Sequence, residues 1–543
     1  MSTLASTMPA DRPLAIASIL EHAARTHPRK GVVSRDGSSF ARFSYVDFAR
    51  RVAKLAHALR ALGVRSGDRV ASFAWNGHRH VELYYAVPMI GAVLHTVNIR
   101  LFPDQVAYVL DHAEDRVVFF DTSLSEAVKA FHAQRPNANR TYIAMGEATG
   151  SFGATCYEEL LSSQPETFDW PKLDEHSAAL LCYTSATTGD PKGVLYSHRS
   201  TYLHALAAGL PDAFGLRERD RVLPIVPMFH VNAWGLPFVA PLAGADLILP
   251  KERLDPAGVI ELCEREEVTF AAGVPTVWMA VRDLLRERKQ RLPSLRRVVI
   301  GGAAMPKSLF EGLDELGIEA IHAWGMTEMS PVGVVNAPIG ELEHDQFFQR
   351  RERLKAGRFS PIVEWRIVDE DGRVVPADGV SRGELLVRGH AVTASYFRND
   401  DASAAAFEPD GWFHTGDVCT IDTFGYLDIV DRLKDFIKTG GEWISSVEVE
   451  NTIMGLEAVR EACVFGVPHP KWQERPVAAI VVREGYELCE ESVRAWLGEK
   501  LAKWQVPDRV LFLEAIPRSG VGKFLKRELR ARYERLFSVE LPD

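Results

Sequence analysis

Helical and strand-like segments alternate along the first third of the chain. Apolar residues recur every three or four positions from 48 to 62, and a short apolar run follows at 70–73. The same order is found at 103–112 with 117–120, and again where 257–265 precedes the sequence VTFAAGVP. The first spacing indicates a helix with one buried face, and a short apolar run indicates a buried strand. This alternation predicts an α/β fold with largely parallel sheets.

The length of the chain and a change in its sequence pattern predict more than one domain. Its 543 residues exceed what one hydrophobic core usually supports. After about residue 360, short strands separated by D-G and R-G turns, as in EWRIVDEDGRVV and GELLVRG, indicate a small β-rich subdomain. The charged segment DRLKD at 431–435 then precedes an α+β tail. We therefore predict an N-terminal domain, residues 1–431, of α/β subdomains plus the β-rich one, and a small C-terminal α+β domain, residues 432–543.

Charge and cysteine usage exclude several classes of protein. The chain has 63 Lys and Arg against 73 Asp and Glu, a net charge of −10, which disfavours a general nucleic-acid or anionic-membrane binder. The six cysteines form no C-x-x-C pair, as is typical of free thiols in a reducing cytosol. The start lacks the basic and apolar regions of a signal peptide, and the most apolar stretch, 83–94, is too short to span a bilayer. We expect a cytoplasmic protein without a membrane span.

The most specific motif is YTSATTGDPKG at 183–193, which follows the apolar run AALLC. Small residues let backbone N–H groups converge on an anion, hydroxyls add donors, and a lysine adds positive charge. The spacing of a Walker loop is absent, so this is a phosphate-binding loop of another kind. Its candidate ligands are Thr184, Ser185, Thr187, Thr188, Gly189 and Lys192.

Six further motifs follow, and together with the loop they cover nearly the whole chain. They are PMFHVNAWG (227–235), GGAA (301–304), HAWGMTE (322–328), WFHTGD (412–417), DRLKDFIKTGGEWIS (431–445) and PRSGVGKFLKR (517–527). The set resembles the adenylate-forming superfamily of acyl-CoA synthetases, peptide-synthetase adenylation domains and luciferases. DRLKDFIKTGGEWISS and FHVNAWG are most similar to segments of bacterial medium-chain acyl-CoA ligases.

The resemblance implies an ATP-dependent acyl-CoA ligase that works in two steps. A small-molecule carboxylic acid and ATP, with Mg²⁺, give an acyl-adenylate and pyrophosphate, and coenzyme A then takes the acyl group as a thioester. It also implies a mobile C-terminal domain, because that domain rotates between the two steps. The expected acid is a medium-chain fatty acid or a similar apolar acid, aryl- and sulfur-containing acids included, since hydrophobic pockets discriminate poorly between near-isosteres.

The resemblance assigns the nucleotide contacts residue by residue. Glu328 supplies a hard carboxylate for Mg²⁺, and Thr327 donates to the α-phosphate. Asp417 accepts from the ribose hydroxyls, and Arg432 reaches the same sugar. Trp324 either stacks on adenine or is an ordinary core aromatic. The remaining implied contacts with ATP or AMP are Gly302, Ala303 and Ala304, whose small size allows close approach, together with Gly325 and Met326.

The resemblance also assigns catalysis and domain rotation to the C-terminal motifs. Lys523, in the glycine-flanked loop SGVGK, steadies the charge that develops as the carboxylate attacks the α-phosphate. Without the motif, the basic segment around it is typical of a solvated helix face. Lys434 is assigned as the hinge. The residues assigned to the coenzyme A path are Lys438, Gly440, Gly441 and Trp443.

The acyl pocket is assigned to the segment that begins at His230. This histidine, a candidate catalytic residue, opens the motif that lines the carboxylate end of the pocket in the family. A lone histidine is otherwise usually structural. The other residues assigned to the acyl pocket are Trp234, Val274, Gly333 and Val334.

Three alternatives stay open. GVSRG at 379–383 matches the G-x-S-x-G elbow of serine hydrolases, although a strand-like segment follows it where a helix is required. A non-catalytic binding protein would be expected to have lost the lysines and carboxylates named above. A luciferase-like protein or a stand-alone acyl-adenylating enzyme would share the adenylation step. Two details are also undecided: Ala186 replaces the usual glycine of the phosphate loop, and a homodimer is the commonest default assembly.

Overall fold

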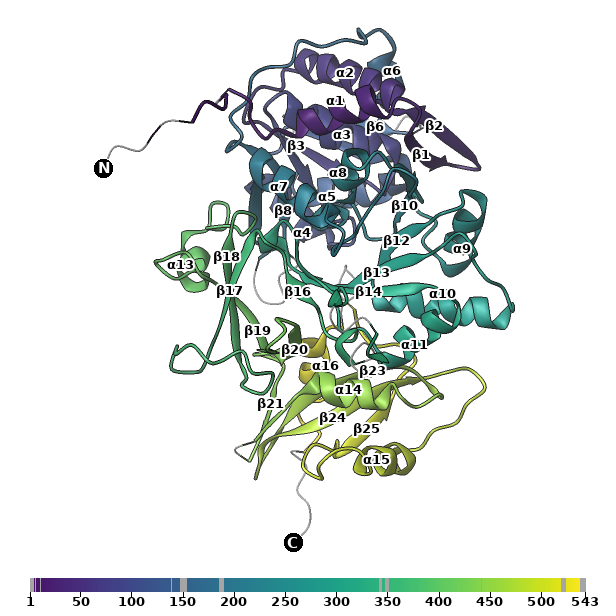
Figure 1. Ribbon diagram of the computed structural model, residues 1–543, viewed down its shortest axis with the longest axis vertical. Helices are drawn as coiled ribbons and strands as arrows, with labels where there is room; N and C mark the ends of the chain where they lie inside the picture. Colours follow the sequence, from purple (N-terminus) through teal and green to yellow (C-terminus); the bar gives the residue numbers. More distant parts are fainter. Residues whose placement is uncertain are drawn as a thin grey trace.

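The computed structural model divides into three parts, which follow one another along the chain from the top of Figure 1 to its base. Two large sheets with their helices form the first part, a small antiparallel sheet the second, and an α+β unit the third. The mixed α/β fold predicted from the sequence is therefore confirmed. The structure describes residues 4, 6–9, 11–137, 139–146, 154–184, 190–340, 344–346, 351–440, 442–518 and 524–537.

The first large sheet has seven strands. Every neighbouring pair is parallel except the last two strands, which form an antiparallel pair. Its order is β7 (Thr155–Cys156), β6 (Thr141–Met145), β5 (Val117–Asp121), β3 (Arg69–Phe73), β4 (Val93–Thr96), β8 (Ala178–Tyr183) and β9 (Gly193–Ser197).

The second large sheet has nine strands and is parallel in its middle. Only the pairs at its two edges are antiparallel. Its order is β16 (Arg358–Phe359), β15 (Val332–Val335), β14 (Glu319–Gly325), β13 (Arg297–Gly301), β12 (Phe270–Gly273), β10 (Arg221–Pro224), β11 (Asp246–Leu249), β1 (Gly31–Asp36) and β2 (Ser39–Ser44).

Helices cover both faces of the two sheets, as parallel sheets require. One continuous apolar core joins the facing sides of the sheets through α1 (Ile16–Thr26), α2 (Tyr45–Ala61), α3 (His78–Met89), α7 (His198–Gly209) and α8 (Leu236–Leu242), with α6 (Tyr157–Ser162) packed on α2. The outer face of the seven-stranded sheet is covered by α4 (Pro103–His112) and α5 (Ser125–Gln134). The outer face of the nine-stranded sheet is covered by α9 (Pro256–Arg265), α10 (Pro275–Glu287) and α11 (Lys307–Glu315).

The middle part is a four-stranded antiparallel sheet, which confirms the β-rich subdomain. It consists of β17 (Val363–Val368), β18 (Gly383–Gly389), β19 (Phe413–Ile421) and β20 (Leu427–Arg432), with α13 (Asp400–Ala406) beside it. The GVSRG segment forms an exposed turn in which the Ser381 hydroxyl donates to Asp378 Oδ2 at 2.8 Å. Because strand β18 follows this turn directly, the strand-to-helix setting of a nucleophile elbow is absent here.

The C-terminal part begins soon after β20. Its sheet runs in the order β22 (Glu442–Ile444), β21 (Ile437–Thr439), β24 (Gln473–Val482) and β23 (Val459–His469), and β25 (Arg509–Phe512) pairs with β24 in parallel. Its helices are α14 (Ser446–Ile453), α15 (Glu490–Gly498) and α16 (Lys526–Arg532). Residues 433–436 form the linker between β20 and β21. Away from this linker, Arg483 forms an ion pair with Asp283 of α10 at 2.5 Å.

The local predictions are confirmed in the first part of the chain. The segment 103–112 coincides with α4, 117–120 lies in β5, and 257–265 lies in α9. Among the described residues, no helix is both long enough and apolar enough to span a membrane.

Candidate active site

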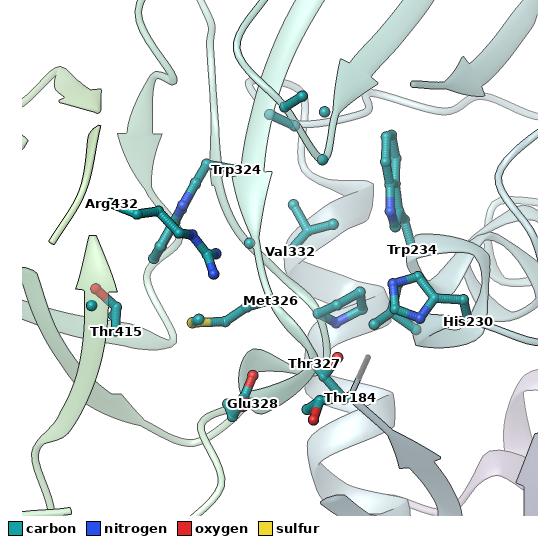
Figure 2. Close-up of a pocket in the computed structure, with 18 of the residues that line it drawn as sticks. Thr184, His230, Trp234, Trp324, Met326, Thr327, Glu328, Val332, Thr415 and Arg432 are labelled. Carbon is teal, nitrogen blue, oxygen red and sulfur yellow. The ribbon is translucent and has the colours of Figure 1, made fainter. Parts of the chain in front are cut away.

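A cavity of about 500 Å³ lies where the carboxyl ends of several parallel strands meet. Strands β10, β12, β13 and β14 end at it, β8 leads into it from the other sheet, and the middle part of the chain closes one side. Ligands of open α/β sheets bind at such edges because the loops there converge. Figure 2 shows Arg432 and Thr415 on one side of the cavity and His230 with Trp234 on the other.

Thirteen of the residues singled out from the sequence line this cavity. They are Thr184, Lys192, His230, Trp234, Val274, Gly302, Ala303, Trp324, Gly325, Met326, Thr327, Glu328 and Arg432. They come from segments far apart in the chain, and the fold brings them to one place. Other assigned residues lie outside the part of the chain that the structure describes: Ser185, Thr187, Thr188 and Gly189 of the phosphate loop, with Ala186 among them, and also Gly441 and Lys523.

The two ends of the phosphate loop are held together by the antiparallel pair β8–β9. Tyr183 lies opposite Gly193 in this ladder, and the backbone N–H of Thr184 donates to the Lys192 carbonyl at 2.8 Å. The Lys192 ammonium lies 4.8 Å from the ring centre of Tyr396. The hairpin therefore brings one hydroxyl and one lysine to the same wall of the cavity.

Glu328 is a buried carboxylate at that wall. Its residue is 7% exposed, and burial raises the pKa of its carboxyl group above the usual value. The Tyr396 hydroxyl donates to Glu328 Oε1 at 2.8 Å, and this bond favours the ionised form. The neighbouring Thr327 is fixed through its carbonyl, which accepts from the Tyr196 hydroxyl at 2.5 Å.

Asp417 lies just outside the cavity lining and contacts two of the residues that line it. Its Oδ2 accepts from Trp324 Nε1 at 2.9 Å, and its Oδ1 lies 2.9 Å from Arg432 Nε. Asp417 and Arg432 are register partners on β19 and β20, so the ion pair is built into the sheet. The Asp417 carboxylate raises the pKa of Arg432. Asp417 is 2% exposed and is not itself part of the cavity lining.

A left-handed turn forms the opposite wall. Four consecutive residues without a glycine among them, 231–234, have φ between 42° and 58°, a conformation that costs L-residues about 1–2 kcal/mol each. Asn232 anchors this turn, because its Oδ1 accepts from the Tyr84 hydroxyl at 3.1 Å and from Cys182 Sγ at 3.3 Å. The turn carries Trp234 into the cavity, where the indole closely approaches Gly301.

Several assigned residues lie away from the cavity lining. Strand β15 starts at the cavity and runs away from it, so Val332 lines the cavity while Gly333 and Val334 do not. Gly333 instead leaves room for Met329, whose Cε would lie 2.1 Å from an added Cβ. Ala304 is exposed beyond the end of β13. The residues assigned to the hinge and the coenzyme A path that also lie outside the lining are Lys434, Lys438, Gly440 and Trp443.

Sequence reasoning missed a set of lining residues from the middle part of the chain. Tyr396 contacts both Lys192 and Glu328, and His414 Nδ1 lies 3.0 Å from Glu384 Oε2. The WFHTGD motif offered a signal for some of them, because it contains residues 413–416 and ends at Asp417. Tyr396 had no comparable signal. The missed residues of this part are Glu384, Tyr396, Ala405, Ala406, Phe413, His414, Thr415 and Gly416.

The cavity offers few protein ligands to a metal ion. No group of three or more His, Cys, Asp or Glu side chains that could hold a metal is found among the described residues. Glu328 contributes one carboxylate, and the hydroxyls of Thr184 and Thr327 line the same cavity. This donor set fits a hard cation that takes most of its oxygen ligands from a bound phosphate or from water.

Two family models match the chain. The model of the AMP-binding enzyme covers residues 20–397, and the model of the AMP-binding enzyme C-terminal domain covers residues 448–523. The chain belongs to the AMP-binding enzyme family. The resemblance drawn from the motifs is thereby confirmed.

Relatives within the AMP-binding enzyme family match over nearly their full length. A long-chain-fatty-acid–CoA ligase of Thermus thermophilus is 47% identical, with 99% of this chain and 98% of the relative covered. A 3-methylmercaptopropionyl-CoA ligase of Ruegeria pomeroyi is 45% identical, with 96% and 98% covered. Among solved structures, an anthranilate CoA ligase in complex with anthranoyl-AMP superposes with a TM-score of 0.87 at 25% identity, covering 98% of this chain and 100% of that one.

Proposed function

We propose that this protein is an ATP-dependent acyl-CoA ligase. A carboxylate oxygen of the acid attacks the α-phosphorus of ATP and pyrophosphate leaves, which gives an acyl-adenylate. The thiol of coenzyme A then attacks the acyl carbon, AMP leaves, and the thiol proton passes to solvent. The observation that carries the proposal is the cavity itself, whose lining combines the charged side chains of Lys192, Glu328 and Arg432 with the apolar side chains of Val274 and Trp234. Figure 2 shows Arg432 and Trp234 on opposite sides of it.

The polar side of the cavity is proposed to hold the nucleotide. Thr184, Lys192 and the rest of the loop contact the phosphates, and Thr327 donates to the α-phosphate. Asp417 and Arg432 contact the ribose, and this requires their mutual ion pair to rearrange or to share the sugar hydroxyls. Trp324, fixed by its bond to Asp417, packs against the base. The small residues at 302–304 and 325–326 allow the nucleotide to approach the backbone closely.

Mg²⁺ is proposed to bind at Glu328. The buried carboxylate is held by Tyr396, and ATP phosphates complete the coordination. The ion would neutralise phosphate charge and orient the departing pyrophosphate. The Lys192 ammonium lies against the ring of the same tyrosine, so we propose that it also helps to neutralise the phosphate charge.

The acyl end is proposed to lie against the left-handed turn. His230 borders the carboxylate, and Trp234 and Val274 form the apolar wall. Gly333 and Val334 follow Val332 along β15 outside the cavity lining, so we propose that they affect this pocket through packing. Because the wall is apolar, we propose a fatty acid of medium length or a similar apolar acid, aryl- and sulfur-containing acids included.

The C-terminal domain is proposed to supply Lys523 for the first step and the coenzyme A path for the second. β20 ends at Arg432 and β21 begins at Ile437, so the proposed boundary at 431/432 precedes the last residue of β20, and the proposed hinge at Lys434 lies between the two sheets. In the hairpin β21–β22 beyond it, the Lys438 ammonium lies 4.4 Å from the centre of the Trp443 ring. The backbone N–H of Gly440 donates to the carbonyl of Trp472 at 3.0 Å.

A cytoplasmic location and a homodimeric assembly complete the proposal. The six cysteines are all free, which suits a reducing compartment. Two-fold dimers are the commonest assemblies of soluble oligomers. Fractionation and the mass of the purified protein in solution test these two points.

The proposed function is tested by pyrophosphate release across a panel of carboxylic acids, with and without coenzyme A. We expect release that depends on ATP, Mg²⁺ and an apolar acid, and thioester formation when coenzyme A is present. Release without any thioester would favour a stand-alone adenylating enzyme, and light emission with oxygen would favour a luciferase. Hydrolysis of a simple ester, lost in Ser381→Ala, would instead favour a hydrolase. Absence of release with every acid would refute the proposal.

Trp234→Ala is expected to shift the acid preference toward longer or bulkier chains. Removing the indole enlarges the pocket, and each methylene that fits a hydrophobic pocket is worth about 1–3 kcal/mol, or roughly tenfold to two-hundredfold in kcat/KM. The measurement is the ratio of kcat/KM values along a series of straight-chain acids. Trp496→Ala, on α15 outside the cavity, serves as the control. An unchanged ratio in the Trp234 variant would remove this residue from the pocket wall.

Tyr396→Phe is expected to move the acid limb of the adenylation pH profile upward. The tyrosine bond favours ionised Glu328, so its loss raises the pKa of this carboxyl further and leaves less carboxylate at a given pH. A hydrogen bond to a charged group is worth about 1.5–3 kcal/mol, which corresponds to about one to two pH units.

The pH dependence of kcat/KM for MgATP measures this shift. Tyr486→Phe is the matched control, because that hydroxyl also donates to a glutamate, Glu457, at 3.1 Å, but on the exposed surface of the C-terminal part. An acid limb that does not move would show that Glu328 does not carry the MgATP dependence.

A further inference from the structure

Helix α16 contacts both the start of α14 and the linker between the two domains. Lys526 opens the helix, and its ammonium donates to Ser446 Oγ at 2.5 Å and pairs with Glu450 Oε1 at 2.8 Å. One turn on, Arg530 Nη1 donates to the carbonyl of Lys434 at 3.0 Å and lies 3.8 Å from Asp435 Oδ1. A single short helix thus contacts both the entry of α14 and the proposed hinge.

The contact of Lys526 extends through Ser446 to Asp431. The Ser446 hydroxyl donates to Asp431 Oδ2 at 2.6 Å, and its backbone N–H donates to the same oxygen at 2.6 Å. Ser446 is fully buried and Asp431 is 2% exposed, so these bonds are shielded from water. Asp431 belongs to β20 and is held in the middle sheet by β19, whereas Ser446 and Lys526 belong to the C-terminal part. These hydrogen bonds therefore connect the C-terminal part to the middle sheet across the linker.

Lys526 is unusual for a lysine in a basic C-terminal segment. Its side chain is 12% exposed, whereas the neighbouring Arg527 and Glu528 are exposed to solvent. Burial disfavours the charge, but Glu450 and the neighbouring Cys463, Asp431 and Asp435 together outweigh this effect, so the pKa of Lys526 is raised. Glu450 Oε1 also accepts from the backbone N–H of Val464 at 2.8 Å, which fixes the carboxylate to β23. The ammonium is therefore held in one place from both sides.

We propose that Lys526 is a positioning residue that holds the C-terminal domain in its adenylating orientation. The bonds from Lys526 to Ser446, from Ser446 to Asp431 and from Arg530 to Lys434 are called the linker clamp here. The proposal rests on the proposed function, because it assigns the described orientation to the first half-reaction. Among the described residues of the hairpin β21–β22, none lines the cavity, so the proposed coenzyme A path is not assembled in this orientation.

The position of Lys526 in the chain explains why it would matter for the first step. It follows Lys523 by three residues in the sequence, and its anchored ammonium fixes the start of α16. Rotation about Lys434 would carry Ser446 and Lys526 away from Asp431, so the linker clamp must break for the second step. Its strength would set the balance between the two orientations.

The test measures both half-reactions in Lys526→Met and Ser446→Ala. Adenylation is followed by pyrophosphate release without coenzyme A, and thioester formation is followed from supplied acyl-AMP. We expect adenylation to fall by up to about a hundredfold, the scale of a misplaced reacting group, while thioester formation is kept or rises. Lys526→Arg should restore most of the adenylation rate. Ser492→Ala, at an exposed position of α15, and Lys500→Met, at an exposed position just beyond the end of this helix, are the matched controls and should change neither step.

A second readout follows the orientation without any reaction. Fluorescent labels are placed on Cys489, the exposed cysteine of the C-terminal part, and on Lys307→Cys, an exposed position on α11, in a Cys156→Ser background. Energy transfer between them should change in Lys526→Met and in Ser446→Ala and return in Lys526→Arg. If Lys526→Met unfolds because Glu450 loses its partner, Lys526→Met/Glu450→Gln and Ser446→Ala decide the question.

Equal losses in both half-reactions with unchanged energy transfer would overturn the proposal, because Lys526 would then be a structural residue only. Unchanged rates in folded variants would also overturn it. If the parent enzyme released no pyrophosphate with any acid, the proposed function would fail. The energy-transfer comparison would still show whether the linker clamp sets the domain orientation.

Discussion

Lys523→Ala should reduce adenylate formation by about a hundredfold or more, the scale of losing one preorganised charge at a transition state, while thioester formation from supplied acyl-AMP persists. The proposed role of this lysine is to steady the charge on the α-phosphate while the acid attacks. In the second step the C-terminal domain has rotated, so Lys523 no longer faces the reacting atoms. The measurement is the rate of each half-reaction at saturating substrates.

Two further variants separate the charge of Lys523 from its surroundings. Lys523→Arg keeps the positive charge but replaces a compact ammonium with a planar fork, so we expect partial activity in the first step. Arg527→Ala removes an exposed charge four positions on and should leave both steps unchanged. A parallel loss of both steps in Lys523→Ala would contradict the role proposed for this lysine.

Lys434→Pro should abolish most thioester formation while adenylation survives. Proline fixes φ near −65°, and a misfit of its ring costs about 3 kcal/mol, which is about a hundredfold in the population of the second orientation at 1.4 kcal/mol per tenfold. The orientation described here keeps Lys434 as an acceptor through its carbonyl, which proline retains. The ratio of the two half-reaction rates measures the effect.

Lys434→Ala shows whether the lost side chain or the fixed backbone is responsible. It removes the ammonium but leaves φ free, so thioester formation should stay well above that of the proline variant. Retention of the full overall rate in Lys434→Pro would place the pivot at another residue of the linker.

Local patterns in the sequence predicted the first part of the fold well. The segments 103–112, 117–120 and 257–265 form the predicted elements, because their apolar spacing reflects burial on one face or both. The GVSRG motif at 379–383 shows the limit of sequence patterns, since its first four residues precede a strand and its last residue begins that strand. The motif carries chemistry only in a strand–turn–helix setting, and the strand-like segment after it already argued against that setting.

The cavity was predictable where a motif marks it and not where tertiary contacts create it. Tyr396 reaches Glu328 across 68 positions of the chain, and such a long-range pair leaves no periodic signal. The strand direction of β15 decides that Val332 lines the cavity and Gly333 does not, because the strand leaves the cavity after its first residue. The conformation of 231–234 was also unpredictable, since its residues include none that favour positive φ strongly except Asn232.

That left-handed turn limits how acid preference can be transplanted between proteins. Its backbone is held by Asn232 together with Tyr84 on α3 and Cys182 on β8, which lie about 150 and 50 positions away in the sequence. A graft of residues 227–235 into another protein would therefore transfer the sequence of the pocket wall without the Tyr84 and Cys182 contacts that hold its left-handed conformation. The smallest transferable unit is the graft plus a hydroxyl at position 84 and a small donor at position 182. In a library that varies only residues 231–234, we expect mostly glycine to be selected, because glycine adopts positive φ without stabilising contacts.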